Sequence, residues 1–147
     1  MKKVKVVDYE FFSISGVHIP EDLIGANLFL EDGSVFTLYN IPKFIAMECM
    51  RLTNKLANDF RLSISEVLAE IPEIEKALSK NIEYIIIDDF DPELGVYSAT
   101  IKRKGSGNRT VKVIPSHGLL LSIIGGIDIY VSKKLIRRGA RGIRRRT

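Results

Sequence analysis

A group of acidic residues, Asp88, Asp89, Asp91 and Glu93, directly follows the apolar run 84–87. Alternate residues of an extended strand point to the same side, so Asp89 and Asp91 can converge on one metal ion. Carboxylate oxygens suit Mg²⁺ or Mn²⁺, and such an ion can activate water to cleave a phosphodiester. The segment 88–95 also contains a proline and a glycine, which are typical of tight turns. We therefore predict a turn here, with a metal site at Asp89 and Asp91 as the alternative.

Three further residues are candidates for acid–base chemistry or anion binding: Glu66, Ser116 and His117. Glu66 ends an S-I-S-E pattern that begins at Ser63, and a helix capping box explains this pattern without catalysis. His117 stands at the start of a predicted helix, where it can act as a general base. Together with Ser116 it can also hold an anion at the helix N-terminus. A partly exposed histidine at a helix start accounts for the same pattern, since one titratable group is not a catalytic constellation.

The C-terminal end of the chain is strongly basic, and the rest is mildly acidic. Eight of the 22 basic residues follow Asp128, and no acidic residue does. These candidate nucleic-acid-binding residues are Lys133, Lys134, Arg137, Arg138, Arg141, Arg144, Arg145 and Arg146. Basic side chains displace counterions from phosphates, so we expect DNA or RNA to bind here without sequence preference. If about five of them engage, log affinity falls with log salt at a slope of about −4 to −5.

The basic end has two alternative roles that do not involve nucleic acid. It can serve as a solubilising tail, or it can pair with the acidic body of a second subunit. We predict one domain over residues 1–136 and a separate basic tail over residues 137–147.

Size and composition indicate a folded globular protein. A chain of 147 residues with 46% hydrophobic and 27% charged residues normally forms one domain. Cys49, the single cysteine, lies in an apolar helical pattern and is predicted to be a plain buried thiol. No apolar run approaches the roughly 18 residues of a membrane span, and the N-terminus lacks the apolar region of a signal peptide. We expect no membrane partner and a cytoplasmic location.

The fold is expected to depend on a short helix at 118–124, entered through Pro115 and Ser116. Its apolar residues fall on every side, which predicts a fully buried helix with Ser116 as the N-terminal cap. The glycine pair 125–126 can adopt the positive φ that ends a helix, and a strand follows at 127–131. Without this helix the neighbouring strands would have no common packing partner.

The remaining elements are predicted from periodicity and turn residues. Strands are expected at 2–7, within 11–20, at 28–30, 35–39, 84–87, 96–103 and 111–113. The glycine of the Asp32-Gly33 pair favours a hairpin between two of them. Helices are expected from 44 to about 58 and from 63 to 80, the second one kinked or split at Pro72. These elements predict an α+β domain with a mixed, mainly antiparallel sheet and two or three packed helices.

Two segments resemble the bifunctional nuclease domain family. The family has a strand motif I-x-D-x-h-x-D-G-x-h-Y-A, and residues 85–99 here read IIIDDFDPELGVYSA. A second family block, D-A-R-P-S-D-A, is followed by a strand ending I-Y-V. Here residues 112–118 read KVIPSHG and residues 129–131 read IYV. Around the family's R-P-L-T-H-D-L, residues 61–68 keep a carboxylate at Glu66. The resemblance covers roughly residues 27–136.

This resemblance implies a single α+β domain that is often a homodimer and, in some members, a nuclease for DNA and RNA. For a nuclease of this kind, the residue chemistry described above makes Asp88, Asp89, Asp91, Glu66 and His117 the candidate catalytic residues, with Mg²⁺ or Mn²⁺ as the cofactor. A non-catalytic dimeric module that binds nucleic acid through the basic tail is the alternative. A third possibility is a regulatory domain that holds a small anion at Ser116 and His117.

Overall fold

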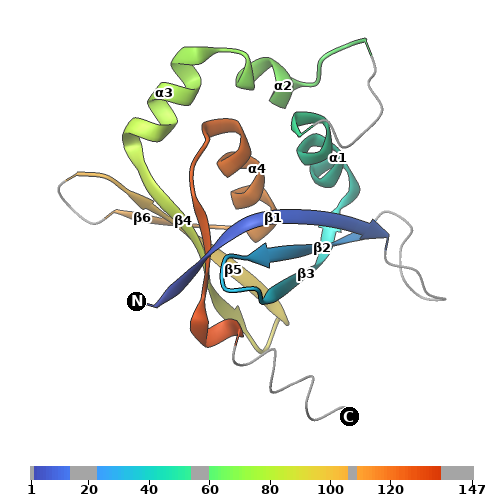
Figure 1. Cartoon of the computed structure of the whole chain (residues 1–147), viewed down its shortest axis with the longest axis vertical. Helices are drawn as coiled ribbons and strands as arrows, with labels where there is room; N and C mark the ends of the chain where they lie inside the picture. The colour runs from blue at the N-terminus through green and yellow to red at the C-terminus, as the bar shows by residue number, and fades with distance from the viewer. Residues whose placement is uncertain (1, 14–22, 54–59, 106–108, 137–147) are drawn as a thin grey trace.

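Seven strands of the described part of the chain form one sheet, as the computed structural model shows (Figure 1). The structure describes residues 2–13, 23–53, 60–105 and 109–136. The strands are β1 (Lys3–Ser13), β2 (Leu23–Leu30), β3 (Val35–Pro42), β4 (Ile82–Asp91), β5 (Val96–Arg103), β6 (Thr110–Val113) and β7 (Ile129–Ser132).

The order of the strands across the sheet is β3-β2-β1-β7-β4-β5-β6. Neighbouring strands are antiparallel except β4 and β7, which run parallel. A parallel pair needs a long crossover connection, which here includes β5, β6 and a helix. This mixed, mainly antiparallel sheet with packed helices confirms the predicted single α+β domain.

The sheet is curled, so that strands far apart in its order come into contact. Figure 1 shows β1, β2 and β3 crossing in front of β4 and β5. The ring of Tyr97 on β5 lies 5.1 Å from the ring of Phe36 on β3 and 4.8 Å from that of Phe90 on β4. The concave side of the sheet therefore encloses the core, whose most buried large side chains include Leu28, Ile85, Ile87 and Val131.

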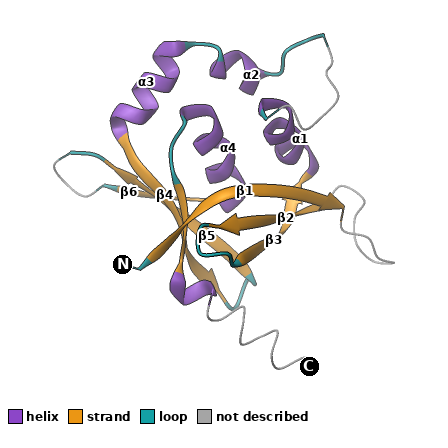
Figure 2. Ribbon diagram, in the orientation of Figure 1, coloured by secondary structure: helices purple, strands orange, loops and turns teal. Residues whose placement is uncertain are grey.

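The helices lie together beside the sheet (Figure 2). They are α1 (Lys43–Leu52), α2 (Ile64–Ala69), α3 (Pro72–Asn81) and α4 (Pro115–Gly125), and a further helical turn covers 133–136. Helix α4 packs against the other three and against the sheet. A Cβ atom on Gly118 would lie only 3.2 Å from a methyl group of Ile85, so glycine lets α4 approach β4 closely.

Helix α4 differs from the prediction in its start and its burial. It begins at Pro115, so Ser116 lies within the first turn and Ile114 occupies the capping position. It ends at Gly125, and the capping residue Gly126 has the left-handed φ of 63° that the glycine pair predicted. The prediction that this helix is buried on every side is wrong. Leu119 is buried, but the other apolar residues are only partly buried: Leu120, Leu121, Ile123 and Ile124. The three other helices cover the outer side of α4 incompletely.

Several other predicted boundaries are confirmed or shifted. The hairpin at Asp32-Gly33 joins β2 to β3, with Gly33 at a φ of 89°. The capping box at Ser63 begins α2, and Pro72 separates α2 from α3. Helix α1 ends at Leu52, before the expected end near 58, and residues 54–59 lie outside the described chain. The strands predicted at 2–7 and within 11–20 form one strand as far as Ser13, and residues 14–20 are not described.

The turn predicted over 88–95 is shorter than expected. Strand β4 continues through the aspartates to Asp91, so the turn covers only 92–95, with Gly95 at a φ of 67°. The continuation is possible because β4 has a bulge between Ile87 and Asp89, where it pairs with β5. A bulge places one extra residue in a strand and redirects the side chains around it.

Within the described residues, no helix is long and apolar enough to cross a membrane.

Candidate functional site

The predicted acidic site does not form a single cluster. The carboxylate of Asp88 accepts hydrogen bonds of 3.0 and 3.1 Å from the hydroxyl of Thr100, and Lys112 lies 3.5 Å away. Asp89 accepts a hydrogen bond from the backbone N–H of Phe90. Asp91 accepts hydrogen bonds from the N–H groups of Glu93 and Leu94, as expected of a residue that closes a turn.

These carboxylates do not fit a divalent metal as they stand. No group of three His, Cys, Asp or Glu side chains among the described residues is placed to hold a metal ion. Asp89 and Asp91 each direct one oxygen to a neighbouring backbone N–H, and Asp88 is paired with a lysine. The predicted metal site at Asp89 and Asp91 therefore stays a prediction that this geometry does not support.

Glu66 has a structural role in the first turn of α2. Its carboxylate accepts a 3.0 Å hydrogen bond from the N–H of Ser63, and the Ser63 hydroxyl accepts one from the N–H of Glu66. The side chain also forms an ion pair with Arg51 of α1. The hydrogen bond from the Ser63 N–H, followed by that from Arg51, lowers the pKa of Glu66. The helix-capping interpretation is confirmed, and a catalytic role is not needed to explain the residue.

Ser116 and His117 are neighbours in sequence, but the structure separates their environments. Ser116 is buried in the first turn of α4 and lines a hollow between α4 and the sheet. His117 is exposed, and it is not among the described residues that line this hollow. The two side chains predicted to hold an anion together therefore do not face one common space.

The single cysteine behaves as predicted. Cys49 is a buried residue of α1; it has no exposed surface and belongs to the hydrophobic core. Burial, with a smaller contribution from the nearby charge of Glu48, raises the pKa of its thiol to about 12. A thiol with such a pKa is a poor nucleophile at neutral pH.

The basic C-terminal end of the chain is only partly described. Lys133 and Lys134 are exposed in the helical turn that follows β7. The predicted contacts Arg137, Arg138, Arg141, Arg144, Arg145 and Arg146 lie outside the described residues.

A second basic surface lies on the side of the sheet that faces away from the core, and we name it the open face. Cross-strand pairing brings its members into a row, because Lys5 pairs with Tyr130 and Tyr130 with Ile86. The row continues from Ile86 to Thr100 and from Thr100 to Lys112. The open face comprises Lys3, Lys5, Tyr84, Lys102, Lys112 and Tyr130, which surround the buried side chains of Ile86 and Thr100.

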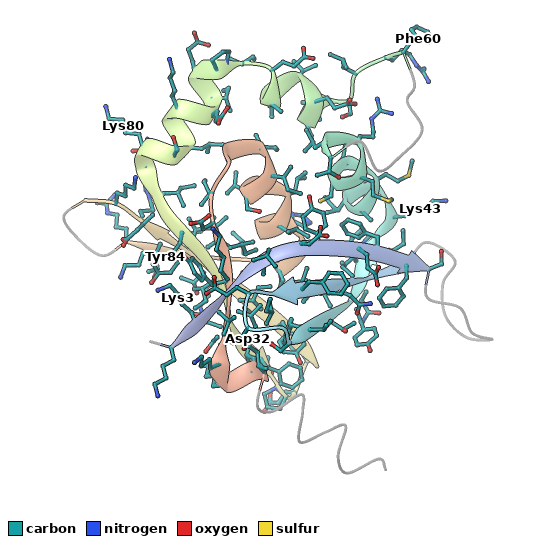
Figure 3. All side chains as sticks on the ribbon, viewed as in Figure 1. Lys3, Asp32, Lys43, Phe60, Lys80 and Tyr84 are labelled. Carbon is teal, nitrogen blue, oxygen red and sulfur yellow. The ribbon has the colours of Figure 1, made fainter. Side chains whose placement is uncertain are left out.

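The centre of the open face is a lysine–tyrosine cluster formed by Lys3, Tyr84, Lys102 and Tyr130. The rings of Tyr84 and Tyr130 meet edge to face, with 5.6 Å between their centroids. The amine of Lys3 lies 4.8 Å from the Tyr84 centroid and 5.0 Å from that of Tyr130. The amine of Lys102, on β5, lies 5.8 Å from the centroid of the Tyr84 ring on the neighbouring strand β4. Figure 3 shows Lys3 and Tyr84 together on one side of the molecule.

Among the residues that the structure describes, neighbouring acids do not neutralise the charges of the cluster. Lys5 pairs with Asp128 at 3.2 Å and Lys112 pairs with Asp88, so these two lysines at the edge of the cluster are balanced. In the described part of the chain, no carboxylate forms an ion pair with Lys3 or Lys102. Cation–π contacts attract a lysine without cancelling its charge, so the cluster keeps a positive potential.

The lysine–tyrosine cluster was not predicted from the sequence. The strand predicted at 2–7 carries Lys3 and Lys5, but no sequence pattern places Tyr84 and Tyr130 beside it. Their proximity depends on the parallel pairing of β4 with β7. The local signal is weak: both tyrosines occupy partly buried strand positions, and Tyr130 lies between the buried Ile129 and Val131.

No protein-family model matches the sequence, and no curated protein matches it. The resemblance to the bifunctional nuclease domain family therefore stays a prediction, and the function has to be argued from the site.

Proposed function

We propose that the protein binds single-stranded nucleic acid on the open face, at the lysine–tyrosine cluster. The observation that supports this proposal is the amine of Lys3 lying within 5.0 Å of two tyrosine ring centroids, with no carboxylate paired to it among the described residues. Proteins that bind single strands combine aromatic rings for base stacking with cations for the backbone. The cluster supplies both kinds of group on adjacent strands.

The expected mode of binding follows from the chemistry of the two residue types. A base stacks on Tyr84 or Tyr130, since every base has a π-face and the contact tolerates any sequence. Lys3 and Lys102 then pair with the flanking phosphates and release their counterions. Paired bases in a duplex are already stacked on their neighbours, so a single strand is the preferred form.

Additional positive charge lies next to the cluster. The strand pairing places Lys3 opposite Ser132, directly before the exposed Lys133 and Lys134. The backbone N–H of Lys133 donates to the carbonyl of Lys2, which holds this turn against the start of β1. A strand of nucleic acid crossing the cluster would therefore continue towards Lys133 and Lys134.

The proposal is tested by the affinity for a fluorescently labelled oligothymidylate, measured by anisotropy in the full chain. Lys3→Gln should weaken binding at low salt by severalfold and make the slope of log affinity against log salt shallower by about 0.7, because one phosphate contact is lost. Lys43→Gln is the matched control, since Lys43 is an exposed lysine at the start of α1 on the opposite side of the view (Figure 3). Equal affinities for both variants and the wild type would refute the proposal.

Nucleic-acid cleavage is a separate prediction that rests on the sequence resemblance. It is tested by incubating the protein with single-stranded DNA or RNA and Mg²⁺ or Mn²⁺, with EDTA as the control. Degradation that EDTA abolishes would support a nuclease, and intact substrate in every arm would count against it.

A further inference from the structure

A hollow of about 160 Å³ lies where the end of β3, the start of β5 and the first turn of α4 meet. Its described walls are mainly apolar and include Leu38, Ile41, Val96, Tyr97 and Ile114. None of the described residues that line it carries a charged side chain. The hollow is therefore suited to an apolar body rather than to a highly charged molecule.

One end of the hollow is formed by the N-terminus of α4, an 11-residue helix. Pro115 occupies the first position, and no side chain caps the helix. The first hydrogen bond of the helix runs from the N–H of Gly118 to the carbonyl of Ile114, so the N–H groups of Ser116 and His117 have no partner in the preceding turn. These groups give the helix end a partial positive charge.

The Ser116 side chain is the second, independent feature. Ser116 is only 4% exposed and lines the hollow, yet among the described residues its hydroxyl has no hydrogen-bond partner. Ser122 in the same helix shows the usual arrangement, since its hydroxyl donates to the carbonyl of Leu119 at 2.7 Å. The hydroxyl oxygen keeps some accessible surface in the hollow, so it is available to a polar group that binds there.

We propose that this hollow binds a small organic carboxylate. The carboxylate lies at the N-terminus of α4, where it accepts from the Ser116 hydroxyl and from free backbone N–H groups. The apolar body of the ligand packs against the aliphatic walls and Tyr97. A single negative charge matches the partial charge of one helix end, whereas a phosphate dianion would need a cation that the described walls lack. This site is separate from the open face and does not depend on nucleic-acid binding.

The test uses benzoate as the probe and follows the amide signals of the full chain by NMR. The proposal predicts saturable shifts of the Ser116, His117, Asn40 and Val96 amides. Benzamide, which has the same ring without the charge, should bind at least about tenfold more weakly, because hydrogen bonds to charged groups are the stronger ones. Inorganic phosphate, an anion without an apolar body, should also bind at least tenfold more weakly.

Ser116→Ala should weaken benzoate binding by about tenfold, the cost of one hydrogen bond to a charged group. Ser122→Ala is the matched control in the same helix and should bind benzoate like the wild type. The amide spectrum of each variant also reports whether it is folded. The proposal is overturned by an absence of saturable shifts at these residues, by equal binding of benzamide or phosphate, or by unchanged affinity in Ser116→Ala.

Discussion

A lysine amine above two tyrosine rings has two physical uses, and Lys3 can serve both. In the free protein it stabilises the pairing of β1 with β7 by about 0.5–1 kcal/mol through cation–π attraction. In a complex the same amine is available to a phosphate, while the rings of Tyr84 and Tyr130 are available to bases. If Lys3 only stabilised the sheet, a carboxylate could lie beside it. The lack of an ion pair to Lys3 among the described residues therefore favours the phosphate-binding use.

Glu66 gives a prediction at the same scale, because it joins α2 to α1. Glu66→Ala removes the capping box and the ion pair with Arg51, and it should lower the melting temperature by about 2–4 °C at neutral pH. The control is Glu31→Ala, since Glu31 is exposed in the turn between β2 and β3. An equal effect of the two substitutions would show that Glu66 contributes nothing through its contacts.

The contribution of Glu66 should also depend on pH. Its pKa is lowered in the folded protein, so its charge stabilises the fold above the unfolded pKa of about 4.3. This stabilisation is lost as the pH falls through the folded pKa. The difference in melting temperature between the wild type and Glu66→Ala should therefore shrink below about pH 4. A difference that is constant with pH would contradict the electrostatic explanation.

At the scale of elements, α4 is the helix that joins the sheet to the other helices. Leu119, a large and fully buried side chain of this helix, is 1% exposed. Leu119→Ala should lower the free energy of unfolding by about 2–5 kcal/mol, since it leaves a cavity in the core. Urea denaturation measures this change, with Leu94→Ala as the control because Leu94 is 73% exposed in the turn before β5. A loss below about 1 kcal/mol would show that α4 is not central to the fold.

Local sequence patterns predicted those elements whose cause is local. Four predictions of this kind are confirmed. Gly33 and Gly126 have positive φ, the capping box at Ser63 begins a helix, and Pro72 separates two helices. The extent of β4 was not predicted, because Asp88 and Asp89 are held in a strand by the bulge and by Thr100 of β5. These are tertiary contacts, and turn propensity is overridden by them.

The candidate site depended even more on non-local pairing. Lys3, Tyr84 and Tyr130 are far apart in the chain and become neighbours only through the strand order β1-β7-β4. The sequence analysis predicted nucleic-acid contacts only at the basic C-terminal end, and not at Lys3 or Lys102. It also grouped Ser116 with His117, although residues adjacent on a helix do not share a face.

At the scale of the whole molecule, the basic tail and the open face should act together on a long nucleic acid. Deleting residues 137–147 removes six arginines and should make the salt slope of binding clearly shallower. The melting temperature should stay unchanged. The shortened chain should keep a residual affinity for nucleic acid that still depends on Lys3. Complete loss of binding would show that the nucleic acid contacts only the tail. The predicted homodimer is tested on the same samples by sedimentation equilibrium.

The most direct test of the proposed function is stacking on the two tyrosines. Affinity for a labelled oligothymidylate is measured for the full chain, for Tyr84→Ala combined with Tyr130→Ala, and for Tyr39→Ala, whose side chain is 63% exposed on β3. The double substitution should weaken binding by about ten- to a hundredfold, because it removes the one base stack that the tyrosine pair provides, and such a stack contributes about 1–3 kcal/mol. Tyr39→Ala should bind like the wild type. A folded double variant with wild-type affinity would contradict binding at the lysine–tyrosine cluster.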